Sequence, residues 1–476
     1  MIHHKAYATK SCKMDYEAFD SHLLQETNLL EQWFLEKKFE EKETSIGSEL
    51  EFFLLDKSFL PSPNNLAFIR SVNQPFLIPE VGAAHLEINS SHFNLHGDCL
   101  SALHQNIKHS WQQCLQKASA ENYHLAMMGS LPTATDVHCK TQFMTDMPRY
   151  HAIEACMAEQ RAGESIQINI EGHECLAIRP ESLAINGLIS SFQLHLQMGL
   201  SQSVRYYNIA QGIAGPLLAL SANAPFLFGL HLVDETRIFS FDQAMTIPYF
   251  DRVKGFNCCL FGTNYLHDSF FELFDQNFQF FPRLLPEVFP DLPPELLFHV
   301  RRQNGVVYRW NRPVIGFNEN AKPHLRIEYR GLSSGPTIID MMANAAFFYG
   351  LLHYLAIQPT PFDSLLSFHA ARKNFYNAAR YGLTAQFLWF SNREVNALTL
   401  IEELLPLAYK GLKCLGISAT DCEYYLSVIK KRIKKKTNGS QWQIKFIEKY
   451  GKDFFHLMEN YLDNQYEGRP VSEWKI

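Results

Sequence analysis

The chain has 476 residues, a formal net charge of −6, and 37 Phe, 20 Tyr and 6 Trp. This aromatic content excludes a disordered chain, and the slightly acidic balance argues against nucleic acid as the main partner, because phosphate binding needs an excess of Lys and Arg. Polar residues interrupt every long apolar window and the ten cysteines form no CxxC pair, so we predict a cytoplasmic protein without signal peptide, membrane span or disulfide framework.

Six stretches have apolar side chains at the three- and four-residue spacing that is typical of amphipathic helices. They are residues 19–35, 100–118, 204–223, 337–355, 362–378 and 392–476. Glycines divide the last stretch into several helices. We therefore predict a first unit of residues 1–380 and a helical C-terminal region of residues 381–476.

Four segments alternate polar and apolar residues with period two, which is the pattern of a half-buried strand. They are residues 49–55, 85–89, 191–197 and 324–330. Because helices and long connections separate them, we predict an α+β fold with a mainly antiparallel sheet. Residues 270–298 are rich in Phe and Pro. The favoured interpretation is a connection on the surface that is packed by aromatic side chains. The alternative is a lid over the active site.

Each predicted strand carries its polar side chains on one face. These are Glu49 and Glu51 on the first strand, Glu87 on the second, His195 on the third, and Arg326, Glu328 and Arg330 on the fourth. Glu80 lies seven residues before Glu87. For any one strand, carboxylates on an exposed edge or a structural histidine are the common alternatives. If the four strands pair, however, their polar faces form one wall.

Such a wall has a definite chemistry. The five glutamates would repel one another at low dielectric, so a buried cluster needs cations. Carboxylate oxygens with a single imidazole favour Mg²⁺ or Mn²⁺ over zinc, and the interleaved arginines suit bidentate contact with phosphate or carboxylate oxygens. The chain has no GxxxxGK[ST] and no GxGxxG motif, so we predict a nucleotide site that uses metal and arginine in place of a glycine-rich loop.

Five blocks of sequence, in this order, resemble the glutamate–cysteine ligase family, in particular the branch that includes the plant-type enzymes and the small bacterial carboxylate–amine ligases. The blocks are residues 46–53 (IGSELEFF), 80–89 (EVGAAHLEIN), 191–196 (SFQLHL), 220–226 (LSANAPF) and 325–330 (LRIEYR). Residues 147–150 and 236–238 are also similar to the family. The third block lacks the glycine and the second histidine that are common in the smaller ligases.

The resemblance implies a fold related to glutamine synthetase, in which a curved antiparallel sheet forms a half-open funnel with helices outside. It implies that residues 1–380 are an ATP-dependent carboxylate–amine ligase domain, which joins the γ-carboxyl of glutamate to the amine of cysteine through an acyl phosphate. There are two alternatives. The nearer one is a ligase of the same mechanism that uses another amine, and the farther one is a catalytically silent binding protein. The implied partners are small-molecule substrates, not nucleic acid or a membrane.

The same resemblance implies roles for individual residues. The ligands of Mg²⁺ (or Mn²⁺) would be Glu49, Glu51, Glu80, Glu87, His195 and Glu328. Arg330 matches a family arginine that stabilises the transferring phosphoryl group, and Arg237 matches one near the glutamate substrate. Four further arginines are candidates for contact with substrate or nucleotide, namely Arg149, Arg309, Arg312 and Arg326. For Arg309 and Arg312, a structural turn with cation–π packing is an equal alternative.

Residues 430–436 hold six basic side chains in seven positions. A run of this kind on a helical pattern is typical of a solvated helix end. We therefore predict that the run is peripheral to the chemistry.

Overall fold

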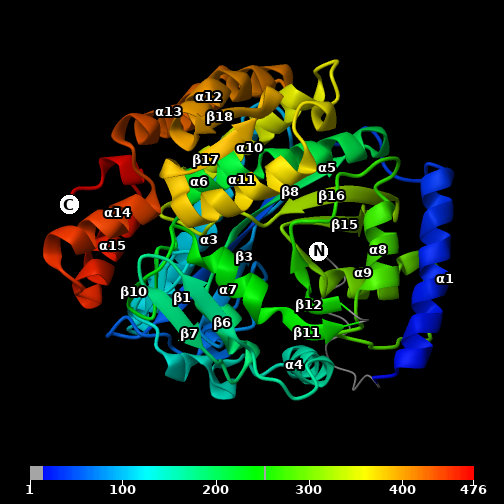
Figure 1. Ribbon diagram of the computed structural model, residues 1–476, viewed down its shortest axis with the longest axis horizontal. Helices are drawn as coiled ribbons and strands as arrows, with labels where there is room; N and C mark the ends of the chain where they lie inside the picture. The colour runs from blue at the N-terminus through cyan, green and yellow to red at the C-terminus, as the bar shows by residue number, and fades with distance from the viewer. Residues whose placement is uncertain (1–13, 251–252) are drawn as a thin grey trace.

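The computed structural model describes residues 14–250 and 253–476, and at its centre lies a curled antiparallel sheet (Figure 1). The strand order is β15 (Asn311–Phe317), β16 (Pro323–Tyr329), β8 (Phe192–Met198), β1 (Ser45–Leu55), β3 (His85–Asn89) and β2 (Leu77–Pro79), while β4 (Phe93–Asn94) and β5 (His124–Ala126) also pair with β1. All pairings in this sheet are antiparallel. The four predicted strands and the α+β class are therefore confirmed.

The register of the sheet gathers the polar side chains on one face. Glu51 lies opposite Glu87 across β1 and β3. His195 lies opposite Glu328 across β8 and β16. Because side chains alternate along a strand, and Glu49 precedes Glu51 by two residues, all five project to the same side. The strands thus build the single polar wall that the sequence pattern predicts.

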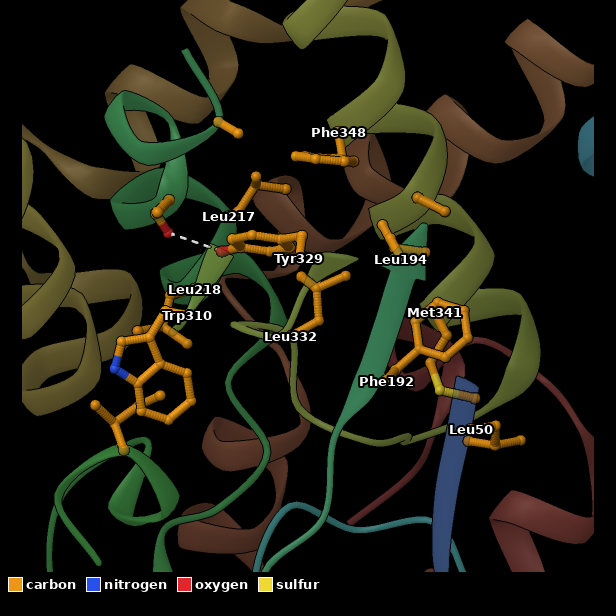
Figure 2. Close-up of a cluster of buried hydrophobic side chains, with 14 of the residues drawn as sticks. Leu50, Phe192, Leu194, Leu217, Leu218, Trp310, Tyr329, Leu332, Met341 and Phe348 are labelled. Atoms are coloured by element: carbon orange, nitrogen blue, oxygen red, sulfur yellow. Dashed lines mark hydrogen bonds between the residues drawn. The ribbon is translucent and has the colours of Figure 1, made fainter. Parts of the chain in front are cut away.

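The opposite face of the sheet packs on helices. Phe52 of β1 meets Trp111 of α3 (Cys99–Ala120) edge to face, with ring centroids 5.1 Å apart. Tyr329 of β16 stacks on Phe348 of α10 (Ile338–Ala356) at 5.0 Å, and its hydroxyl donates to the carbonyl of Ala214 in α6 (Ala214–Ser221) at 3.3 Å (Figure 2). Each such side chain contributes about 1.5–3 kcal/mol by leaving water. The core therefore lies between the sheet and this helix layer, and the polar face is left for a site.

The remaining elements surround the sheet. At one edge, α1 (Tyr16–Leu35) packs against α8 (Glu272–Phe280) and α9 (Phe298–Gly305) (Figure 1, α1 in blue). The other helices before residue 382 are α2 (Asn65–Val72), α4 (Pro148–Gln160), α5 (Ser203–Gly212), α7 (Thr236–Ala244) and α11 (Phe368–Tyr381). Short strands are β6 (Ile168–Glu171), β7 (Cys175–Ile178), β9 (Phe226–Leu227), β10 (Leu230–His231), β11 (Thr246–Phe250), β12 (Val253–Asn257), β13 (Cys259–Leu260) and β14 (Tyr308–Arg309).

The helix predicted over residues 204–223 is divided in two, α5 and α6, at Ile213. Pro216 has no N–H with which to bond the carbonyl of Gly212, so the regular ladder is interrupted there. The helix predicted from residue 362 begins instead at Phe368, because Ser367 caps it by accepting a hydrogen bond from the backbone N–H of Ala370. Both differences arise from local backbone hydrogen bonds. The spacing of apolar residues gives no information about these bonds.

The C-terminal region begins with a hairpin, β17 (Gln386–Trp389) and β18 (Arg393–Asn396), and continues in four helices. These are α12 (Ala397–Cys414), α13 (Ala419–Lys435), α14 (Gly439–Tyr450) and α15 (Phe454–Glu467). Helix α12 packs along α10, and a Cβ on Gly411 would lie 1.8 Å from the carbonyl oxygen of Gly350, so the two backbones meet directly. The division near residue 380 stays a prediction, but the helices on its two sides share one core.

The basic run of residues 430–436 has two environments. Its five lysines are exposed, as predicted for a solvated helix end. Arg432 is an exception, since it is buried and donates to Asn344 Oδ1 at 2.9 Å and to the carbonyl of Asp340 at 3.0 Å. Its Nε lies 3.5 Å from Asp340 Oδ1. The prediction was therefore wrong for this one residue, which connects α13 to the core helix α10.

Helix α10 is long and apolar enough to cross a membrane, the one such helix in the part of the chain that the structure describes. However, 89% of its most apolar window is buried inside the protein. This burial is expected for the core helix of a globular protein. The described cysteines are all free thiols.

Candidate active site

A cavity of about 280 Å³ opens on the polar face of the sheet. Most of the residues predicted for the site line it, namely Glu49, Glu51, Glu80, Glu87, Arg149, Arg237, Arg312 and Arg330. They come from β1, β3, β15, the loop after β2, the start of α4, the start of α7 and the end of β16. Segments far apart in the sequence therefore converge on one polar space.

The most compact group of possible metal ligands is Glu49, His195 and Glu328. One ligand atom from each lies within 4.8 Å of the others, and His195 Nε2 lies 3.1 Å from Glu49 Oε1. The three residues occupy neighbouring strands, so the register of the sheet fixes their spacing. Two carboxylates and an imidazole at this spacing can share one divalent ion.

Burial and neighbouring carboxylates disfavour the ionised forms of two further glutamates of the cavity, Glu80 and Glu87. Burial and the neighbouring Glu51 raise the pKa of Glu80 to about 7. Burial together with Glu49 and Glu80 raises the pKa of Glu87 well above its ordinary value. Both shifts mean that the funnel holds more carboxylates than it can ionise together without added positive charge. A bound cation would relieve this repulsion.

Glu328 differs because two arginines surround it. Arg330 donates from Nη1 to Glu328 Oε1 at 2.5 Å, and Arg312 donates from Nη2 to Glu328 Oε2 at 2.8 Å. Burial by itself raises the pKa of Glu328, but Arg312 and Arg330 outweigh it and hold the pKa well below its ordinary value. Glu328 is thus a carboxylate that stays ionised between the metal group and two guanidinium groups.

Neighbouring amides fix the orientation of Glu51. Gln193 Nε2 donates to Glu51 Oε1 at 2.7 Å, and the backbone N–H of Ser191 donates to Glu51 Oε2 at 2.5 Å. Gln193 also accepts from Arg330 Nη1 at 2.6 Å. One amide side chain therefore connects the carboxylate of β1 to the guanidinium at the end of β16.

Comparisons with known proteins agree with this geometry. The family model described as glutamate-cysteine ligase family 2 matches residues 45–465. The chain belongs to glutamate–cysteine ligase family 2. It is therefore an ATP-dependent carboxylate–amine ligase, and the family predicted from the five blocks is confirmed. A comparison with curated proteins gives no match.

Solved structures show the same fold as this family 2 chain. Glutamate–cysteine ligase from Francisella tularensis, in complex with AMP, superposes with a TM-score of 0.53 and 10% identity, covering 90% of this chain and 89% of that one. A bifunctional glutathione synthetase from Pasteurella multocida gives 0.52 and 12%, covering 93% of this chain and 55% of that one. The predicted glutamine synthetase-like funnel, with helices outside, is confirmed as the fold.

Two arginines reach the family 2 cavity from helices. Arg149 is the second residue of α4, and its guanidinium lies 5.1 Å from the ring of Tyr150. Arg237, in the first turn of α7, is buried and lies 5.5 Å from the ring of Trp310. Its Nε donates to Glu235 Oε1 at 2.9 Å. Both arginines line the cavity.

Two predicted arginines lie elsewhere. Arg309 is buried, donates from Nη2 to Asn277 Oδ1 of α8 at 3.0 Å, and lies over the ring of Phe281 at 5.3 Å. This placement favours the structural cation–π alternative. Arg326 shares the polar face of β16 with Glu328. Like His195 and Glu328, it is not among the described residues that line the cavity.

The sequence interpretation missed two arginines of α9, Arg301 and Arg302, which line the cavity together with Tyr308. Arg301 lies 5.6 Å from the ring of Phe317 in β15. The available signal was the adjacent pair of arginines close after the Phe- and Pro-rich segment. From that segment Leu285 also lines the cavity, so part of residues 270–298 borders the site.

Proposed function

We propose that this family 2 ligase is a glutamate–cysteine ligase, which uses ATP to join the γ-carboxyl of glutamate to the amine of cysteine. The observation that carries the proposal is the pairing of Glu328 with both Arg312 and Arg330 beside Glu49 and His195. Such a site combines metal-ligating carboxylates with guanidinium groups, which is what transfer of a phosphoryl group to a carboxylate requires.

The residues present fit a divalent cation. The donors are carboxylate oxygens and one imidazole, and burial with like charge raises the pKa of Glu80 and Glu87. Glu49, His195 and Glu328 would hold the ion, with Glu51, Glu80 and Glu87 nearby. When bound, Mg²⁺ supplies positive charge that neutralises phosphate oxygens during transfer.

The chain's own groups then have separate tasks. Arg330 and Arg312 bind the phosphoryl oxygens that face β16, while Arg237 and Arg149 bind and orient the carboxylate substrate. A γ-carboxylate oxygen attacks the γ-phosphorus, and the bond to the bridging oxygen of ADP breaks. The amine nitrogen then attacks the acyl carbon, the carbon–oxygen bond breaks, inorganic phosphate leaves, and the nitrogen loses a proton. The enzyme needs no covalent nucleophile for either step.

A second candidate is a ligase of the same mechanism that uses an apolar amine. The cavity wall includes Ile153, Leu183, Phe241 and Met245, which offer hydrocarbon and few polar partners. A small thiol would leave part of this surface uncovered, whereas a larger apolar amine would bury it.

The test is ADP release by the full chain with ATP, Mg²⁺, glutamate and a panel of amines that includes cysteine and apolar amines. We expect release that depends on both glutamate and cysteine. Faster release with an apolar amine supports the second candidate. Absence of release with every amine would indicate a binding protein of this fold instead of a working enzyme.

Metal binding gives a prediction that does not depend on turnover. Mg²⁺ with a non-hydrolysable ATP analogue should raise the free energy of unfolding, by about 2.7 kcal/mol when the ligand is at one hundred times its Kd. Glu49→Gln should remove most of the Mg²⁺-dependent part, because it removes a ligand from the compact group. Thermal denaturation with the analogue, with and without Mg²⁺, measures this difference.

The matched control is Glu402→Gln, which changes an exposed glutamate of α12 far along the chain from the site. It should keep the full metal-dependent increase. Glu328→Gln provides a second site variant. If both site variants keep the increase that the control shows, the metal ligands have been assigned wrongly.

A further inference from the structure

A buried chain of hydrogen bonds runs from the last two helices, α14 and α15, to Arg237. We propose that these helices position the guanidinium of Arg237 for the carboxylate substrate, acting through Asn223 and Glu235. The inference rests on the proposed function for the role of Arg237, but the contacts that carry it are independent of any substrate. No residue of α14 or α15 lines the cavity formed by the described residues.

Arg237 is held on three sides. Its Nε donates to Glu235 Oε1 at 2.9 Å, its Nη2 to the carbonyl of Gly331 at 2.6 Å, and its Nη1 to the carbonyl of Arg330 at 3.3 Å. A guanidinium has five N–H donors, so two remain for a ligand in the cavity. The direction in which those two donors point is decided by the three acceptors.

The first acceptor, Glu235, is fully buried. One of its oxygens accepts from Arg237, and the other accepts from the backbone N–H of Asn223 at 2.9 Å. A buried carboxylate is tolerated only with such partners. Burial raises the pKa of Glu235 although Arg237 opposes this change. Any movement of Asn223 would therefore disturb the carboxylate that orients Arg237.

Asn223, also fully buried, makes two of its side-chain contacts with the C-terminal helices. Its Oδ1 accepts from Gln443 Nε2 of α14 at 2.9 Å, and its Nδ2 donates to Tyr461 Oη of α15 at 2.8 Å. The packing is close, because a Cβ on Gly439, the first residue of α14, would lie 2.0 Å from Asn223 Oδ1. Helix α14 therefore packs directly against the side chain of Asn223.

The carbonyl acceptors of Arg237 depend on the same helices. Gly331 begins the loop after β16, and Asn223 Nδ2 donates to the carbonyl of Ser334 in this loop at 2.7 Å. Gln465 of α15 donates to the carbonyl of Pro336 at 2.7 Å. Both the carboxylate and the carbonyl contacts of Arg237 are therefore connected to α14 and α15. This arrangement gives the C-terminal region an indirect task, which is to position Arg237.

The test variant is Gln443→Met, which keeps the side-chain length and removes the amide that binds Asn223. We expect the KM for glutamate to rise about tenfold, the usual scale for one unsatisfied buried group, and the KM for ATP to stay within about twofold. In an Arg237→Ala background the same change should add nothing to the KM for glutamate, because the residue through which it acts is gone. Gln441→Met is the matched control in the same helix, since its amide contacts Asp234.

A crystal structure of Gln443→Met provides a readout without turnover. The expected result is that the guanidinium of Arg237 has left the carbonyl of Gly331. An unchanged Arg237, or an equal rise in KM in the Arg237→Ala background, overturns the inference. If the unsubstituted chain releases no ADP with glutamate and any amine, the proposed function fails, and the crystal structure alone decides the inference. Tyr461→Phe, which removes one hydroxyl, replaces Gln443→Met if that variant does not fold.

Discussion

Replacing Arg330 with alanine is expected to lower kcat by about two to three orders of magnitude, the usual loss when one preorganised stabilising group is removed. Arg330 directly follows β16, two residues after Glu328, and lines the cavity. Charge on the phosphoryl oxygens shifts during transfer, so a guanidinium held in place stabilises the transition state more than the bound substrate. The Kd for ATP should therefore change much less than kcat.

Three further measurements distinguish catalysis from structure at this residue. Arg330→Lys should restore little of kcat, because a point charge does not reproduce the planar guanidinium. In Arg330 the single nitrogen Nη1 donates to both Glu328 and Gln193. Arg393→Ala, which breaks an exposed ion pair with Glu403, is the control and should keep its activity. Near-normal kcat in Arg330→Ala, with a large fall in melting temperature, would assign Arg330 to a structural salt bridge.

Replacing Arg432 with alanine is expected to reduce the free energy of unfolding by about 3–5 kcal/mol, as when one partner of a buried ion pair is removed. The change would leave Asp340 buried without its cation and would remove the hydrogen bond to Asn344. Burial already raises the pKa of Asp340 with Arg432 in place. Urea denaturation of the purified chain measures the loss.

The basic run itself supplies the control for Arg432. Lys434 and Lys435 lie in the same helix but are exposed, and replacing both with glutamine should change the free energy of unfolding by less than about 0.5 kcal/mol each. A loss below about 1 kcal/mol for Arg432→Ala would contradict the structural role given to it. In that case the packing of α12 and α13 on α10 would not depend on this ion pair.

The sheet could be predicted from the sequence because each strand has one polar and one apolar face. The segment of residues 85–89, for example, alternates between Glu87 on the polar side and Leu86 and Ile88 on the side of the core, and it is a strand with the predicted bounds. The break at Ile213 could not be predicted in the same way. Apolar spacing continues through it, and only the missing N–H of Pro216 marks the interruption.

The site was predictable where its residues belong to the main sheet. Glu49, His195 and Glu328 meet because period two and strand pairing together determine which side chains are neighbours. Arg309 belongs to the two-residue strand β14, which pairs with β13 outside this sheet, so no face could be assigned to it. The position of Arg301 depends on how α9 packs against the rest of the protein. The local sequence pattern does not contain this information. Tertiary packing therefore decided the positions of Arg301 and Arg309, while the register decided those of Glu49, His195 and Glu328.

At Glu80 and Glu87, folding stability and catalysis favour different side chains, because the raised pKa values indicate that the ionised carboxylates are unfavourable in the folded protein. A neutral side chain at either position would remove repulsion, so selection for heat resistance alone would favour glutamine there, whereas selection for turnover would keep glutamate. Binding of the substrates should therefore increase local stability in the funnel more than in other parts of the molecule. Ligands that complete its charge balance should protect the surrounding loops from proteases more than they protect the distant helices α12 and α13.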